Sequence, residues 1–187
     1  MIYEDIAGRA REIQKVIFEA SVDVPIDVLW QHILGIFDES ECSELSGLDL
    51  QRWSSVLSEQ VRAIFANEPF PDDLAFIYFD LYDSLEKASS FESARVGFYL
   101  SGGTDTRCEE AVENGDLSYF PVRRRLYIDV LDRIRDRGRE TPEHRGAFNR
   151  LILLAGASVL AKGALSGLGP QVPAFVGFDS GDYFQVR

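Results

Sequence analysis

The sequence predicts an α+β fold in which a small antiparallel sheet, made from two hairpins, packs against several helices. Three observations lead to this prediction. Apolar residues recur at helical spacing in several segments, alternate with a period of two in a central region, and alternate again at the C-terminal end. The chain has 187 residues, 45% of them hydrophobic, which is enough for one sizeable core. We therefore expect one domain over residues 1–187, with a helical N-terminal part (1–70) and a mixed strand and helix part (71–187).

The N-terminal part predicts three helices. Residues 2–20 carry apolar side chains spaced by threes, fours and sevens, as on one face of a helix. Pro25 suits the first position of a second helix, whose buried side extends to Phe37. A third helix begins near Leu50 and ends in the segment 67–71, which contains two prolines.

Two strands are expected next. Residues 74–82 and 95–100 are rich in aromatic and β-branched side chains, which favour strands. The connection between them, residues 83–94, is longer than a tight turn and has room for a helical turn. Residues 104–118 are polar and acidic, and no element is predicted there.

The next region predicts two further helices. Pro121 precedes an arginine-rich stretch that we interpret as a helix with Leu126, Val130 and Ile134 facing inward. Thr141 and the proline that follows it suit the start of another helix. Its buried stripe is expected to consist of Phe148, Leu151, Ile152, Ala155 and Val159.

The C-terminal segment 174–187 predicts a hairpin with a three-residue loop, Asp179-Ser180-Gly181. In that register Val176 lies opposite Phe184, and the apolar residues share one face. A two-residue loop would mix the two faces. The last residue of a three-residue loop adopts a left-handed conformation, which glycine accepts most readily. Gly181 occupies that position.

The charge of the chain is strongly negative and unevenly distributed. The net charge is −12. Residues 1–120 contain 24 acids and 8 bases, net −16, whereas residues 121–187 contain 7 acids and 11 bases, net +4. Such a surface repels nucleic acid and anionic membranes, so we expect neither as a partner. It suits a basic protein partner, and it equally suits plain solubility. The arginines at 123–139 are expected to pair with acids of the first 120 residues.

The sequence contains no recognisable catalytic, cofactor or metal motif. The glycine-rich segments match neither phosphate-binding pattern, and we interpret them as turns. His32 and His144 have no nucleophile or zinc partner nearby in the sequence. Asp80 and Asp83 lie on opposite faces of an ideal strand, so they do not converge on an ion. We therefore expect no cofactor and no metal. Whether the chain is an enzyme stays open, although the sequence favours a protein without catalytic activity.

The candidate partner-binding residues are acidic or aromatic and flank turns. Each acid has an ordinary alternative role, because aspartates at turns commonly hydrogen-bond to nearby backbone amides. The residues are Asp72, Asp73, Asp179, Asp182 and Tyr183.

The two cysteines, Cys42 and Cys108, lie far apart and outside any C-x-x-C pattern, so we expect two reduced thiols. The first residues show neither the basic region nor the apolar run of a secretory signal. The longest apolar stretch, 151–165, is interrupted by lysine and glycine and is interpreted as a buried helix. These features favour a cytoplasmic protein.

Two short motifs suggest a family. A strand run follows the proline break at 70–76, and the terminal hairpin carries a G-F-D-x-G-D pattern at 177–182. This arrangement resembles the bacterial immunity-type domains of polymorphic toxin systems, of the SUKH-like or a related kind. The resemblance covers the chain from residue 70 onward and implies a small, acidic, cytoplasmic protein that binds and neutralises a cognate toxin. The three N-terminal helices lie outside it.

The function expected from these observations is non-enzymatic binding of a basic protein partner, such as a toxin. Two other classes remain open. A small cytoplasmic enzyme would assemble its site only in the fold, and would show a deep pocket with a histidine beside a carboxylate. A self-associating structural subunit would show a symmetric apolar patch.

Overall fold

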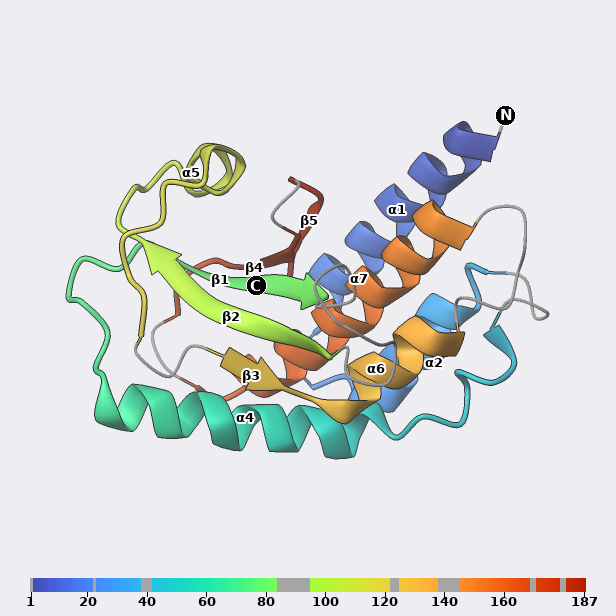
Figure 1. The fold of residues 1–187 in the computed structure, drawn as a ribbon, viewed down its shortest axis with the longest axis horizontal. Helices are drawn as coiled ribbons and strands as arrows, with labels where there is room; N and C mark the ends of the chain where they lie inside the picture. The colour runs from blue at the N-terminus through green and yellow to red at the C-terminus, as the bar shows by residue number, and fades with distance from the viewer. Residues whose placement is uncertain are drawn as a thin grey trace.

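The computed structural model describes residues 2–21, 23–37, 42–83, 95–121, 125–137, 145–168, 171–178 and 181–187. Figure 1 shows the chain with its helices and strands. In chain order the elements are α1 (Ile2–Glu19), α2 (Ile26–Leu34), α4 (Leu50–Asn67), β1 (Phe76–Asp83), β2 (Val96–Gly103), α5 (Cys108–Asn114), β3 (Arg125–Tyr127), α6 (Asp129–Arg137), α7 (Arg145–Leu165), β4 (Ala174–Gly177) and β5 (Tyr183–Gln185). The predicted α+β class is confirmed.

The strands form one mixed sheet in the order β3-β2-β1-β4-β5. The two expected hairpins are present, because β1 pairs with β2 and β4 pairs with β5, both antiparallel. The expectation of a purely antiparallel sheet is wrong, because β1 and β4 are parallel. The chain returns to the sheet through the long helix α7, and a crossover of this kind brings the next strand in parallel to the first.

Helix α7 lies at the centre of the molecule, between the sheet and the N-terminal helices (Figure 1). Every side chain from Leu151 to Ala161 is buried, and Phe148 is buried too, so the expected stripe is confirmed. The stretch Gly146–Leu165 is long and apolar enough to cross a membrane, but 78% of an 18-residue window within it is buried inside the fold, as expected for a core helix. Ser54 of α4 donates to the carbonyl of Leu160 at 3.3 Å, which ties the two helices together.

The N-terminal helices and the mixed part share one hydrophobic core. Asp49 caps α4 by accepting a hydrogen bond from the Arg52 amide at 2.8 Å. Trp30 of α2 is fully buried and donates from Nε1 to the carbonyl of Leu45 at 3.1 Å. Helices α1, α2 and α4 are therefore integrated with the rest of the chain and cover the outer side of α7.

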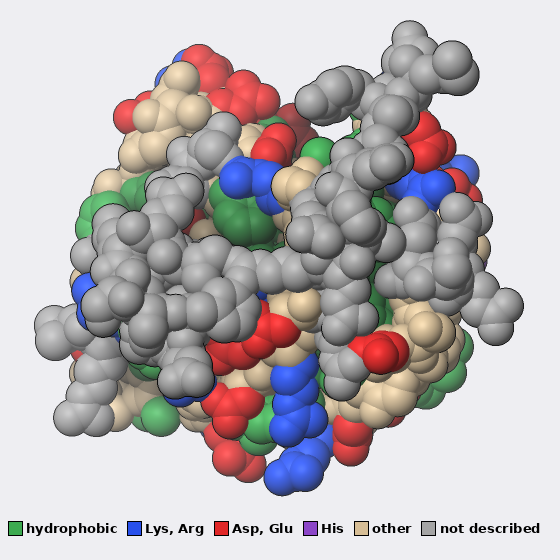
Figure 2. Space-filling view, turned by 45° about the vertical axis from the view of Figure 1, so that its right-hand side comes forward, with side chains coloured by type: hydrophobic (Ala, Val, Ile, Leu, Met, Phe, Trp, Pro, Cys, Tyr) green, Lys and Arg blue, Asp and Glu red, His purple; other side chains and the backbone are tan. Residues whose placement is uncertain are grey.

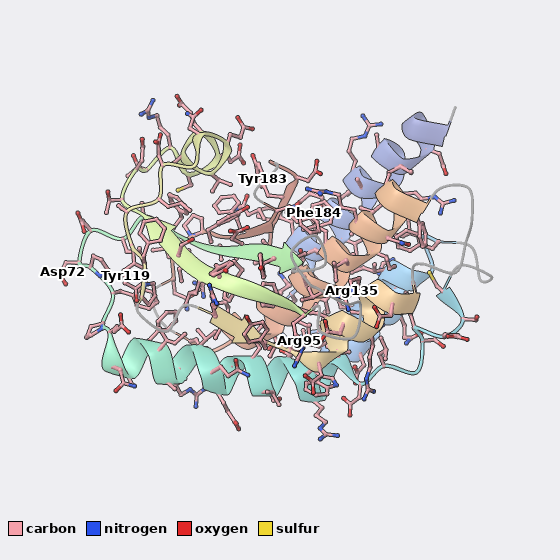
Figure 3. All side chains as sticks on the ribbon, viewed as in Figure 1. Asp72, Arg95, Tyr119, Arg135, Tyr183 and Phe184 are labelled. Atoms are coloured by element: carbon pink, nitrogen blue, oxygen red, sulfur yellow. The ribbon has the colours of Figure 1, made fainter. Side chains whose placement is uncertain are left out.

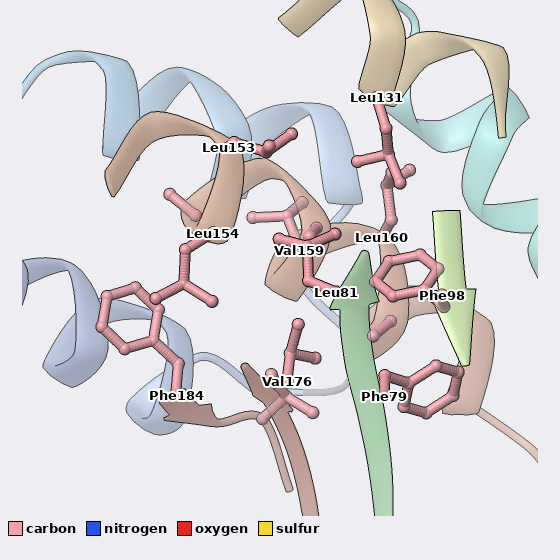
Figure 4. Packing of buried hydrophobic residues seen from close by; sticks show 14 of the residues in the cluster. Phe79, Leu81, Phe98, Leu131, Leu153, Leu154, Val159, Leu160, Val176 and Phe184 are labelled. Atoms are coloured by element: carbon pink, nitrogen blue, oxygen red, sulfur yellow. The ribbon is translucent and has the colours of Figure 1, made fainter. Parts of the chain in front are cut away.

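The C-terminal hairpin has the predicted register. Val176 lies opposite Phe184, and Gly181 has a φ of +96°. Figure 4 shows Val176 and Phe184 packed with leucines in the main core. The expected inward residues of the hairpin are all buried, namely Ala174, Val176, Phe178, Phe184 and Val186.

The last two residues are also held by the fold. Ala174 accepts a hydrogen bond from the Val186 amide and donates to the Arg187 carbonyl, so two residues oppose one, as in a β-bulge. The Arg187 guanidinium donates to the carbonyl oxygens of Val172, Leu165 and Leu168. It thereby ties the C-terminal residue to the end of α7 and to the connection that follows this helix.

The open edge of β5 is closed by α1. Gln185 forms a non-hydrogen-bonded pair with Phe175, so its backbone groups face away from β4. The Gln14 side-chain amide donates to the Gln185 carbonyl at 3.1 Å and accepts from its amide at 3.0 Å. Gln14 thus occupies an edge that would otherwise be available to another strand.

Two elements differ from the sequence prediction. Residues 104–118, for which no element was expected, contain α5. The arginine-rich region begins with strand β3 and becomes helical only at α6, so the expected helical position of Leu126 is wrong. Leu126 is buried, as expected. The cause is its position in a strand, where it alternates with the exposed Arg125 and Tyr127. Thr141 and the connection 84–94 lie outside the described residues.

Candidate functional site

Helix α5 covers part of the sheet face that α7 does not cover. Ala111 is buried in a small second cluster with Phe76, Tyr78 and Phe175 of the sheet. The helix ends at Gly115, whose φ of +69° is the left-handed conformation of a helix C-cap. The sheet therefore has aromatic side chains buried on both of its faces at this end.

The outer side of α5 is acidic. Glu109, Glu110, Glu113 and Asp116 are exposed, and Figure 2 shows acidic side chains gathered along the upper edge of the molecule. The neighbouring base is Arg107, which forms ion pairs with Asp105 at 2.8 Å and with Glu110 at 3.0 Å. Residues 105–116 contain five acids and one base, so the surface keeps a negative charge after this pairing.

Tyr183 of β5 connects the hairpin to this acidic helix. Its ring lies edge-on to Phe175, with 5.8 Å between ring centroids, and its hydroxyl donates to Glu113 Oε1 at 3.3 Å. Partial burial raises the pKa of the Tyr183 phenol, and the charges of Glu113 and Glu109 raise it further. Glu109, Glu110, Glu113 and Tyr183 define what we call the α5–β5 surface.

A shallow groove of about 420 Å³ adjoins this surface. One side comes from α5 and the residues just before it, and the other from the C-terminal hairpin. The lining residues are Thr106, Arg107, Cys108, Glu109, Glu110, Pro173, Phe175 and Gln185. The groove combines the partly exposed Pro173 with the exposed carboxylates of Glu109 and Glu110, which suits a long cationic side chain.

The structure separates the predicted partner-binding residues. Tyr183 lies on the α5 side of the sheet, whereas Asp182 is exposed and pairs with Arg150 of α7 at 2.8 Å. Asp72 and Asp73 are exposed in the turn before β1, and Figure 3 shows Asp72 well apart from Tyr183. Asp179 lies outside the described residues.

The glutamates of α5 are functional candidates that sequence reasoning missed. Their segment, E-E-A-V-E-N-G at 109–115, contains good helix formers followed by a glycine suited to the C-cap. That signal was sufficient to predict a short helix. The sequence could not show that this helix lies beside Tyr183, because that proximity comes from the pairing of distant strands.

The described residues do not assemble a nucleophilic or metal site. Cys42 and Cys108 are both free thiols, as predicted. Burial raises the pKa of the Cys108 thiol, which disfavours the reactive thiolate. His32 is exposed at the end of α2, and His144 lies outside the described residues. No group of three or more metal-binding side chains occurs in the part of the chain that the structure describes.

The arginines of the C-terminal region have several kinds of neighbours. Arg135 is buried and pairs with Asp136 at 2.9 Å and Asp132 at 3.5 Å of its own helix. Arg125 lies over the Tyr99 ring. Among the described residues, one ion pair between the two charge regions has the opposite direction to those expected, because Arg95 of the acidic region binds Asp132 at 2.8 Å.

Comparison with known proteins gives no match: no protein-family model, no curated protein and no solved structure matches this chain.

Proposed function

We propose that this chain is a non-enzymatic, acidic protein-binding domain whose α5–β5 surface receives a basic segment of a partner protein. The partner class that fits best is a basic toxin, which the chain would neutralise as an immunity or inhibitor protein. The observation that carries the proposal is the position of Tyr183, whose hydroxyl contacts Glu113 beside the groove that contains Phe175.

The chemistry of this surface favours a lysine or arginine side chain. The aliphatic part of such a side chain can pack against the partly exposed Pro173, while its charged end reaches Glu109 or Glu110. Tyrosine is enriched among the residues that dominate binding energy at protein interfaces. Tyr183 already has its ring held against Phe175, so little conformational entropy is lost when a partner binds.

The overall charge supports the same partner class. A net charge of −12 steers a basic protein toward the chain and raises the association rate, an effect that salt weakens. Like-charge repulsion works against nucleic acid and anionic membranes as partners. The proposal places the chain in the cytoplasm, where both cysteine thiols remain reduced.

Affinity capture from the native cell with charge-reversed variants tests this function. The double variant Glu109→Lys/Glu113→Lys reverses two neighbouring charges of the α5–β5 surface. The control, Glu12→Lys/Glu19→Lys, makes the same change in net charge on the exposed side of α1. Both variants must first show wild-type unfolding curves.

We expect wild type and the α1 control to retain the same basic protein, and the α5 variant to lose it. The purified pair should then associate with an affinity that falls as salt rises. Retention of a basic protein by all three chains, or of none by wild type, would contradict the proposal.

A further inference from the structure

A second pocket lies where α7 meets α2 and α4. Its volume is about 250 Å³. Buried Ile26 and Leu29 form an apolar wall. The polar and charged residues that line it are Ser21, Asp23, Gln51, Lys162 and Ser166.

Among the residues that line this pocket, Lys162 is the one with a positively charged side chain. It lies in the last turn of α7 and is half-buried. Its ammonium donates one hydrogen bond, to the Val186 carbonyl at 3.1 Å. An ammonium carries three donors, and in the described part of the chain no carboxylate forms an ion pair with it. Burial lowers the pKa of Lys162.

The residue after Lys162 packs tightly against α2 beside the pocket. A Cβ at Gly163 would contact Ile26 Cγ1 at 2.6 Å, so α7 already lies as close to α2 as a glycine permits. The Lys162 ammonium is held beside the C-terminal strand by its hydrogen bond to the Val186 carbonyl.

From this geometry we propose that the pocket binds a small monocarboxylate, with Lys162 as the counter-ion and the wall formed by Ile26 and Leu29 in contact with the hydrocarbon part. The hydroxyl groups of Ser21 and Ser166 at the rim supply further donors. The volume limits the ligand to a small organic acid. Asp23, at the same pocket, disfavours ligands with two negative charges.

Sodium butyrate is a suitable probe, with 1-butanol as the uncharged analogue and sodium chloride at equal ionic strength as the salt control. The amide signals of Gly163 and Ser166 in NMR spectra report on the pocket. We expect saturable shifts of these signals with butyrate and not with butanol or chloride. Lys162→Met should weaken binding by about tenfold or more, the effect of losing a charge-assisted hydrogen bond.

Two further variants keep the test decisive. Lys15→Met removes an exposed lysine of α1 and should leave butyrate binding unchanged. Gln51→Glu places a carboxylate at the pocket while preserving the acceptor for the Ile26 amide, and should abolish binding even if Lys162→Met fails to fold. Absence of saturable shifts in wild type, an equal response to butanol, or full binding by folded Lys162→Met or Gln51→Glu would overturn the proposal.

Discussion

Val176 lies directly opposite Phe184 in the pairing of β4 with β5, and both side chains are buried in the main core. This pairing follows from a loop of three residues, since a loop one residue shorter would place Val176 opposite Gln185. The hairpin is therefore an integral part of the sheet. Its other face is covered too, because Phe175 is 1% exposed.

The first prediction concerns the two faces of this hairpin. Phe184→Ala should lower the free energy of unfolding by about 3–5 kcal/mol, because it leaves a cavity in the core. Tyr183→Ala should cost clearly less, since that side chain is partly exposed. Urea unfolding of both variants measures the difference. Equal losses would show that the two faces are buried to the same degree.

The second prediction concerns the loop. Gly181 has a φ of +96°, and a β-branched side chain is strained there. Gly181→Val should therefore lower the free energy of unfolding by about 1 kcal/mol or more. No side chain or backbone lies within 4 Å of a Cβ at this position, so backbone conformation is the cause. A variant as stable as wild type would be inconsistent with this conformation.

The third prediction compares glycines in two helices. Gly163→Ala should destabilise the fold by roughly 1–3 kcal/mol, because its Cβ would overlap Ile26. Gly8→Ala in α1 meets open space and should stabilise the fold by about 0.5–1 kcal/mol through helix propensity. Thermal unfolding measures whether each variant is less stable or more stable than wild type. A neutral Gly163→Ala would mean that α7 does not pack tightly against α2.

The fourth prediction concerns Tyr183 and its acidic neighbours. Burial is the largest cause that raises the pKa of Tyr183 above its ordinary value of 10.0, and the charges of Glu113 and Glu109 raise it further. Glu113→Gln should lower that pKa without returning it to the ordinary value, because burial remains. NMR of ring-labelled tyrosine measures the Tyr183 pKa in wild type and in Glu113→Gln. The Tyr183 signal is assigned by its loss in Tyr183→Phe.

The same shift predicts a pH effect on stability. A raised pKa means that the folded state keeps the Tyr183 proton longer than the unfolded state does. The stabilisation is fully present below the unfolded pKa of about 10 and is lost as pH rises through the folded pKa. Tyr183→Phe should remove this part of the decline in stability at alkaline pH. An unchanged decline would exclude Tyr183 as its source.

The sequence predicted most of the helices, though not α5, and the C-terminal hairpin, because their patterns are local. Leu50 and Val61 of α4 fall on one face at helical spacing, and the parity of Val176 and Phe184 determines one register. Both patterns can be read within a few turns of helix or one hairpin. In the structure Leu50 and Val61 are buried, and Val176 lies opposite Phe184, as the two patterns predict.

The parallel pairing of β1 with β4 could not be predicted in the same way. Ile77 lies beside Ala174, almost a hundred residues later, and neither residue carries a signal of the other. The candidate site depends on that pairing, because it brings Tyr183 beside Glu113 of α5. The sequence identified Tyr183 as a candidate, but its acidic neighbours became visible only once the strands were placed.

Amide hydrogen exchange of the chain with and without its captured basic partner tests the central claim most directly. If the α5–β5 surface is the binding site, the partner should slow exchange in residues 108–114 and 183–185, and salt should diminish that protection. The Glu109→Lys/Glu113→Lys variant should show no such protection at the same partner concentration. Protection confined to α4 or to the turn at Asp72 and Asp73, with α5 and β5 unchanged, would contradict the account.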